Sequence, residues 1–200
     1  MLHTPFQAAI VDLDGTLVDT LGDFHATLSR MLAQLQQPPV QRDAVERFIG
    51  KGSEHLIRNV LAHVGAPAAL YEQAWATYQA VYRDLNGRHA QVYAGAAEGL
   101  ARLRAAGLRM ACLTNKPTEF ARDLLRLKGL DAAFDVVFGG DAFARKKPDP
   151  LPLLKTCEAL GVVPALTLMV GDSSNDAAAA RAAGCPVVLV TYGYNHGEPV

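Results

Sequence analysis

Two aspartates directly follow a short apolar run near the start of the sequence, and their spacing is the first indication of chemistry. Residues 8–11 are apolar and predict a buried strand, and Asp12 and Asp14 come next with Leu13 between them. In an extended chain alternate side chains share a face, so we expect the two carboxylates side by side. Such a pair repels, and its burial is costly unless a cation neutralises it. The spacing therefore predicts a cationic partner at this point.

Polar residues also follow three later apolar runs. Thr114 and Asn115 end the second run, Lys147 follows the third, and Asp172 and Asp176 follow the fourth. The carboxyl ends of parallel strands meet at one edge of a sheet, which is where doubly wound folds bind ligands. We therefore expect these side chains to converge with the first aspartate pair on one site.

The donor atoms in this set favour a hard cation. No histidine or cysteine lies near these acids in the sequence, and carboxylates with a backbone carbonyl suit Mg²⁺. An EF-hand is excluded, because a loop starting at Asp12 would place Leu17 at the glycine position and Asp23 at the closing glutamate. Mg²⁺ held by a few carboxylates completes its shell with water and phosphate oxygens, and a carboxylate can attack phosphorus. The pattern predicts Mg²⁺-dependent phosphoryl transfer through an aspartyl phosphate.

Each of these features alone has a simpler explanation. The Asp12 and Asp14 pair is also compatible with a solvated strand end, and Lys147 with the exposed surface where most lysines lie. Thr114-Asn115 and the segment 172–176 are compatible with helix capping. It is the order of all four, each at the end of an apolar run, that favours a common site.

Apolar runs alternate with helical patterns through most of the sequence. The runs cover residues 8–14, 108–115, 134–140, 165–172 and 185–190. Four helical patterns lie between the later runs and end at glycines, namely Gly107, Gly129, Gly161 and Gly184. This alternation predicts an α/β fold, a doubly wound parallel sheet with helices on both faces.

Residues 21–87 differ, because they show helical spacing and no strand pattern. We predict that residues 19–87 form a helical cap domain, inserted into a core domain made of residues 1–18 and 88–200. Aromatic residues at helical spacing in this segment are expected to pack in its interior rather than to line a ligand site: Tyr71, Trp75, Tyr78 and Tyr82.

Composition limits the partners. The chain has 200 residues, 50% hydrophobic and 20% charged, with a net charge of −1, so no overall field favours nucleic acid or an anionic membrane. Its three cysteines are far apart in sequence and suit a reducing compartment. No signal peptide is recognisable, and no run approaches the about 20 apolar residues of a spanning helix. We therefore expect a cytoplasmic protein that acts on a small molecule, whose oligomeric state the sequence does not indicate.

The four polar segments together resemble the haloacid dehalogenase superfamily of phosphohydrolases. The segments "DLDGTLVDT", "LTN", "KKPDP" and "GDSSND" are similar to its first, second, third and fourth motifs, in order and at suitable spacing. The resemblance spans essentially the whole sequence and implies a Rossmann-like core with a cap after the first motif. Within the superfamily, "TNKPTEFARDLL" and "TYGYNHGE" are most similar to phosphoglycolate phosphatases. Those enzymes continue past the latter segment with a short strand and helix, so we expect a trimmed sheet edge or a truncated chain.

The resemblance implies a role for each motif residue. It implies that Asp12 is the nucleophile and that Asp14 is the general acid for the leaving alkoxide and then the base for water. Thr114 is implied to bind the transferring phosphoryl group, and Lys147 rather than Lys146 to neutralise the nucleophile and the phosphate. The implied Mg²⁺ ligands are Asp12, the Asp14 carbonyl, Asp172 and Asp176, the last through water or by orienting the lysine. The implied substrate-binding residues of the motifs are Thr16 and Asn115.

The loop "FIGKGSEH" at 48–55 is our prediction for the specificity loop of the cap. Gly50 and Gly52 would permit close backbone approach, and Lys51 with the start of a helix would meet an anionic end of the substrate. A glycine-rich turn between two helices with a solvated lysine explains the same residues.

The resemblance favours 2-phosphoglycolate as the substrate and leaves alternatives open. A pyrophosphatase, a nucleotide or sugar phosphatase, or a β-phosphoglucomutase-like enzyme would share the motifs. A phosphoacceptor regulatory domain also carries acids at strand ends, a threonine and a lysine, but needs neither the cap nor Asp14. A binding protein without catalysis is disfavoured because every motif residue is present.

Overall fold

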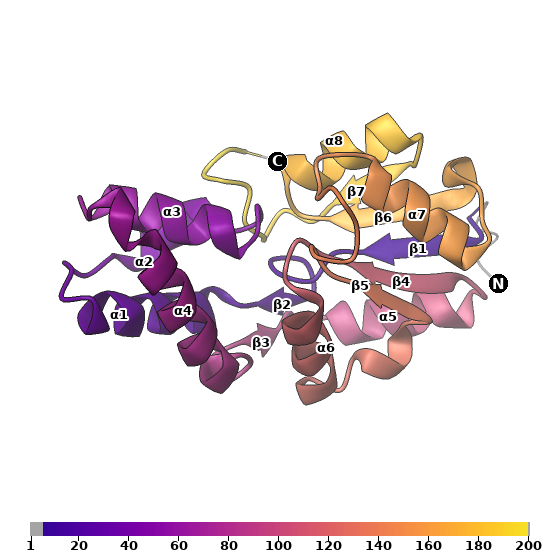
Figure 1. The fold of residues 1–200 in the computed structure, drawn as a ribbon. Coiled ribbons are helices and arrows are strands. Elements are labelled where there is room, and N and C mark those ends of the chain that lie inside the picture. Colours follow the sequence, from indigo (N-terminus) through magenta and orange to yellow (C-terminus); the bar gives the residue numbers. More distant parts are fainter. Residues whose placement is uncertain (1–5, 200) are drawn as a thin grey trace.

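The computed structural model describes residues 6–199 and contains a five-stranded sheet in the order β5-β4-β1-β6-β7, with every neighbouring pair parallel (Figure 1). The strands are β1 (Ala8–Val11), β4 (Arg109–Leu113), β5 (Val136–Phe138), β6 (Thr167–Gly171) and β7 (Val187–Leu189). Strand β1 is central, with Ile10 in register with Ala111 on one side and Met169 on the other. All four residues of β1 are buried, as expected for a strand covered on both faces.

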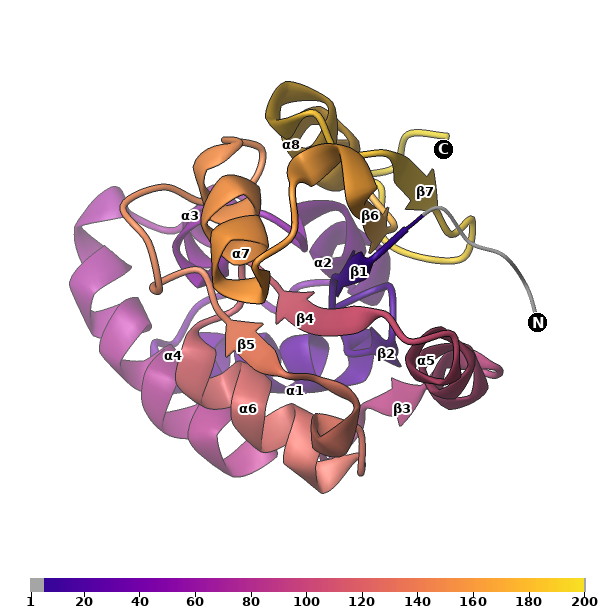
Figure 2. The same cartoon turned by 90° about the vertical axis from the view of Figure 1, so that its right-hand side faces the viewer.

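Helices cover both faces of this sheet. They are α5 (Ala96–Ala105), α6 (Thr118–Leu127), α7 (Leu151–Leu160) and α8 (Ser174–Ala183), with short 3₁₀ turns η2 (Asp131–Ala133) and η3 (Pro164–Leu166). Figure 2 shows α7 and α8 on one side of the sheet and α5 and α6 on the other. The side chains of β1 alternate between the two: Ala9 packs with the cluster under α5 and α6, and Ile10 with the cluster under α7 and α8.

A helical unit is inserted after the first strand. It comprises α1 (Leu21–Gln34), α2 (Arg42–Phe48), α3 (Ser53–His63), η1 (Ala68–Leu70) and α4 (Tyr71–Leu85). A two-stranded antiparallel ribbon of β2 (Val18–Asp19) and β3 (Gln91–Val92) joins it to the sheet domain. The predicted fold class, a doubly wound parallel sheet with an inserted helical cap, is confirmed. The exact domain limits at 18/19 and 87/88 stay a prediction.

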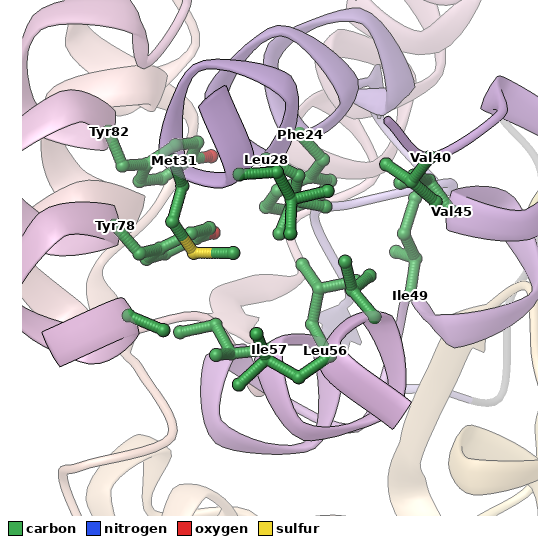
Figure 3. Packing of buried hydrophobic residues seen from close by; sticks show 14 of the residues in the cluster. Phe24, Leu28, Met31, Val40, Val45, Ile49, Leu56, Ile57, Tyr78 and Tyr82 are labelled. Atoms are coloured by element: carbon green, nitrogen blue, oxygen red, sulfur yellow. The ribbon is translucent and has the colours of Figure 1, made fainter. Parts of the chain in front are cut away.

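The cap has its own hydrophobic core, shown in Figure 3. Tyr78 and Tyr82 are fully buried in it, and their stacked ring centroids lie 5.3 Å apart. Tyr71 and Trp75 pack against the same cluster as partly buried side chains. These four aromatic residues therefore pack in the cap as predicted. Among the described residues, no helix is both long and apolar enough to cross a membrane.

Candidate active site

The structure brings the polar strand ends together at the carboxyl edge of the sheet. The chain leaves β1 with the Asp12 N–H donating to the carbonyl of Val170 on β6, so Asp12 lies beside the end of that strand. The turn continues through Gly15, whose φ of +83° favours glycine. A Cβ at Gly15 would overlap the carboxylate of Asp172, so glycine also permits this close approach.

Three acids form a buried cluster at this edge. One carboxylate oxygen from each of Asp12, Asp172 and Asp176 lies within 4.8 Å of the others, and the three residues are 8%, 2% and 0% exposed. Buried carboxylate oxygens so close together suit a hard divalent cation, so the cluster could hold a metal ion.

Other groups fix the orientation of these carboxylates. Asp172 accepts hydrogen bonds from the Thr16 hydroxyl at 2.7 Å and from the Tyr194 N–H at 2.7 Å. Asp176 sits in the first turn of α8 and accepts from the N–H and hydroxyl of Ser173, at 3.1 and 2.8 Å. Both acids are therefore held in place by neutral donors as well as by charge.

Lys147 is the cation at the centre of the cluster. Its Nζ lies 2.7 Å from Asp176 Oδ1 and 3.1 Å from Asp12 Oδ1, and it donates to the Leu113 carbonyl at 2.8 Å. Lys147 is 3% exposed, whereas Lys146 is exposed. The structure therefore places Lys147, as expected, beside the predicted nucleophile.

Burial and mutual repulsion shift the ionisation of this cluster. Burial raises the pKa of Asp12 well above its ordinary value; Lys147 opposes that shift, while Asp176 and Asp172 add to it. Burial, together with Asp176, raises the pKa of Asp172 to about 7. Burial lowers the pKa of the Lys147 ammonium, but the carboxylates of Asp12 and Asp176 outweigh it and the net shift is upward. Full ionisation of this acidic cluster is therefore unfavourable, and a further positive charge bound beside it would stabilise the ionised carboxylates.

A cavity opens between Asp12 and the cap, with about 400 Å³ of atom-free space including its opening to solvent. The core contributes the polar residues that follow β1 and β4 to its walls, and the cap contributes apolar side chains and the start of α3. The lining residues are Asp12, Asp14, Phe24, Ile49, Gly50, Gly52, Ser53, Leu56, Thr114, Asn115 and Lys116. The space suits a small molecule with one end at the acids and the other against the cap.

Comparisons with known proteins identify the family. The family model described as haloacid dehalogenase-like hydrolase matches residues 6–184. The chain belongs to the haloacid dehalogenase-like hydrolases. It is 44% identical over 199 residues to a phosphoglycolate phosphatase of Thiobacillus denitrificans, covering 98% of this chain and 88% of that one. It is 47% identical over 191 residues to a plasmid-encoded phosphoglycolate phosphatase of Cupriavidus necator, covering 95% and 83%.

A solved structure agrees with this assignment. The crystal structure of a predicted phosphoglycolate phosphatase from Haemophilus somnus 129pt has a TM-score of 0.95 and 31% identity, covering 99% of this chain and 91% of that one. The resemblance to this superfamily and the enzyme class expected from the sequence, a phosphoric monoester hydrolase, are confirmed.

In this hydrolase the second-motif residues connect core and cap. The Asn115 amide donates to the Gly50 carbonyl of the cap loop and to the Lys147 carbonyl, both at 2.9 Å, and its Oδ1 accepts from the Lys147 N–H at 3.0 Å. Asn115 therefore fixes the backbone on both sides of the cavity. Thr114 lines the same cavity, and its hydroxyl accepts from the Lys116 N–H at 3.2 Å.

The cap loop lies at the cavity only in part. Gly50 and Gly52 line it, but Lys51 between them is exposed and lies in a separate surface depression with His55. The structure thus does not bring Lys51 together with the other predicted site residues, and its substrate-binding role stays a prediction.

Two residues of the site were given no role from the sequence. Lys116 is 4% exposed, and its Nζ lies 3.0 Å from Asp14 Oδ1 and also bonds to the Tyr82 hydroxyl. Its place directly after Thr114 and Asn115 was the available signal. Tyr194 holds Asp172 through its N–H, and its hydroxyl bonds to Asp19. Tyr194 lies in the segment "TYGYNHGE", whose resemblance was noted without a role, because its contact with the first motif joins opposite ends of the chain.

Proposed function

We propose that this protein is a Mg²⁺-dependent phosphatase that hydrolyses 2-phosphoglycolate through an aspartyl phosphate. The observation that carries the proposal is the buried Asp12, Asp172 and Asp176 cluster, with Lys147 paired to Asp12 and Asp176 and with Asp12 lining a small cavity beneath the cap. The relatives named phosphoglycolate phosphatase support the choice of substrate.

In the first step, a carboxylate oxygen of Asp12 forms a bond to phosphorus while the bond from phosphorus to the leaving oxygen breaks. Asp12 Oδ1 accepts from the Leu13 N–H at 2.7 Å and lies 3.1 Å from Lys147, so the carboxylate is already oriented. Asp14, which lines the same cavity, gives a proton to the leaving alkoxide. Asp14 then takes a proton from a water molecule that attacks phosphorus and releases Asp12.

The remaining predicted residues hold the phosphoryl group and its counter-charges. Mg²⁺, with Asp12, the Asp14 carbonyl, Asp172 and Asp176 as its ligands or water-mediated contacts, would supply positive charge against the developing charge on the phosphoryl oxygens. Lys147 supplies a further positive charge beside the nucleophile. Thr114 and Asn115 would donate hydrogen bonds to phosphoryl oxygens, and Thr16 keeps Asp172 in place.

Phosphate release from a panel of esters tests this proposal. The panel contains 2-phosphoglycolate, pyrophosphate, a nucleotide and a sugar phosphate, each with Mg²⁺ and with EDTA. We expect the highest kcat/KM for 2-phosphoglycolate, with activity lost in EDTA and in Asp12→Asn. The matched control is Asp131→Asn, which changes an exposed aspartate of η2 and should leave turnover unchanged.

The other outcomes separate the alternatives. Turnover that favours sugar phosphates or nucleotides would keep the mechanism and reject the substrate. A phosphoprotein that persists for minutes with no multiple turnover would favour the regulatory domain and reject the enzyme.

A further inference from the structure

Lys116 is a buried cation on the cavity wall, separate from the acid cluster that Lys147 serves. Its Nζ lies 4.6 Å from the ring centroid of Phe24 and 4.8 Å from that of Tyr82, so the ammonium sits among aromatic faces of the cap. A lysine ammonium has three N–H donors. Within residues 6–199, Lys147 uses them on three oxygens, whereas Lys116 has two oxygen partners, Asp14 and Tyr82. One donor of Lys116 is therefore left for the cavity.

A second buried polar group, the Tyr78 hydroxyl, belongs to the same aromatic cluster of the cap. The Tyr78 hydroxyl is fully buried and has Ser53 as its hydrogen-bonding neighbour in the described part of the chain. Figure 3 shows the rings of Tyr78 and Tyr82 extending from α4 in the same direction. Burial raises the pKa of Tyr78 and a hydrogen bond with Ser53 opposes that rise, so its hydroxyl lies beside a residue that lines the cavity. A tyrosine hydroxyl can both donate and accept, so it can bond to an anion in the cavity as well as to Ser53.

The start of α3 completes this wall. Gly52 and Ser53 line the cavity, and Ser53 is the first residue of an 11-residue helix, whose first N–H groups have no partner within the helix. The partial positive charge of a helix N-terminus adds to that of Lys116. Lys116 and the start of α3 thus line one cavity, with the Tyr78 hydroxyl beside Ser53, and each of these groups can help to bind an anion.

The chemistry of the proposed reaction indicates which anion this is. Asp14 serves the leaving oxygen in that mechanism, and Asp14 Oδ1 lies 3.0 Å from Lys116 Nζ. In 2-phosphoglycolate the carboxylate is attached to the carbon that carries the leaving oxygen. A substrate whose leaving oxygen meets Asp14 therefore brings its carboxylate near Lys116. Phe24, Ile49 and Leu56 contribute apolar walls to the same cavity.

We propose that Lys116, with the Tyr78 hydroxyl and the first turn of α3, binds the carboxylate of the substrate and thereby selects 2-phosphoglycolate over uncharged phosphate esters. This inference rests on the proposed function. It gives to Lys116 the role that the sequence alone suggested for Lys51.

A pair of substrates and a pair of unreactive analogues test it. Turnover of 2-phosphoglycolate is compared with that of ethyl phosphate, which lacks the carboxylate. Binding of 3-phosphonopropionate is compared by calorimetry with that of propylphosphonate, which differs in the same way and cannot be hydrolysed. The measured quantity is the ratio between the carboxylate-bearing member of each pair and its partner. A variant that loses activity through a change at Asp14 loses it for both members, so the ratio is unaffected.

We expect Lys116→Met to reduce both preferences by about 10- to 100-fold, the effect of losing one charge-assisted hydrogen bond. Tyr78→Phe keeps the ring and should reduce them by about 3- to 10-fold for one neutral hydrogen bond. Lys155→Met, an exposed lysine of α7, is the matched control and should change neither. If Lys116→Met fails to fold, the Tyr78→Phe result decides.

Two results would overturn the inference and can be told apart. If the wild-type protein prefers 2-phosphoglycolate but Lys116→Met and Tyr78→Phe keep that preference, the inference fails alone; a loss in Lys51→Met instead would move the site to the cap loop. If the wild-type protein shows no preference for 2-phosphoglycolate over ethyl phosphate, the proposed substrate fails and the carboxylate site fails with it.

Discussion

Replacing Lys147 by methionine is expected to destabilise the metal-free protein strongly, because two buried acids pair with this cation. Its Nζ lies 2.7 Å from Asp176 and 3.1 Å from Asp12. At an effective dielectric constant of about 20, each contact corresponds to roughly 5 kcal/mol of Coulomb attraction, most of it offset by desolvation of the charges. Breaking a buried pair on one side typically costs about 3–5 kcal/mol, and we expect that loss in the free energy of unfolding near neutral pH.

The loss should depend on pH with a definite sign. A carboxyl whose pKa is higher in the folded than in the unfolded chain stabilises the fold below its unfolded value, and this contribution is lost as the pH rises through the folded value. Asp172 has a folded pKa of about 7 against an ordinary 3.8, and the pKa of Asp12 is also raised. Without Lys147 both rise further, so the variant should lag behind wild type most at pH 7 and above. The difference should shrink as the pH falls to about 7, the folded pKa of Asp172 in the wild type, and below it.

Urea unfolding in EDTA at about pH 7.5 and pH 5 measures both effects. Lys155→Met is the matched control, because that lysine pairs with Glu158 on the surface and its loss should change stability by less than about 0.5 kcal/mol. A deficit for Lys147→Met below about 1 kcal/mol, or one equal at the two pH values, would refute the assignment of Lys147 as the counter-ion of the acid cluster.

Three further predictions concern the metal and the joint between cap and core. Mg²⁺ at 100 times its dissociation constant should raise the free energy of unfolding by about 2.7 kcal/mol, and Asp172→Asn should remove most of this gain in urea titrations with and without MgCl₂. Tyr194→Phe should cost about 2–4 kcal/mol in urea unfolding, because its hydroxyl accepts from two backbone N–H groups at the start of α1. Asp23→Ala should lower the free energy of unfolding by a similar amount in the same assay, because Asp23 accepts from the N–H groups of Gly87 and His89 at 2.6 Å. An unchanged urea midpoint for Tyr194→Phe or for Asp23→Ala would contradict the hydrogen bonds assigned to that residue.

The sheet and its covering helices were predictable because their causes are local. Each strand was a short apolar run, and each covering helix had an apolar stripe ended by a glycine such as Gly161 or Gly184, both left-handed in the structure. The β2 and β3 ribbon was not predicted. With two residues in each strand it has no period to detect, and it exists because distant segments pair.

The candidate site was predictable only where the neighbouring sequence makes a residue type energetically unfavourable unless it has a partner. Carboxylates after a buried strand must be neutralised, so Asp12 and Asp14 stood out from the sequence alone. Lys116 did not, because lysines are mostly exposed and its burial depends on the packing of α1 and α4 against the core. Lys51 attracted a prediction through its flanking glycines, yet the residues on both sides of it face the cavity and Lys51 does not.

Hydrogen bonds and an ion pair connect the cap to the predicted catalytic residues of the core. The Gly50 carbonyl of the cap loop accepts from Asn115, the same side chain that holds the backbone of Lys147. The next residue, Lys116, contacts Asp14 of the core and the aromatic rings of the cap. Moving the cap away would therefore remove contacts from Asn115 and from Lys116 together. The geometry around Asp14, the predicted general acid, and around Lys147, the predicted counter-ion, therefore depends on a closed cap. Enclosure of the substrate and alignment of these two residues are thus linked.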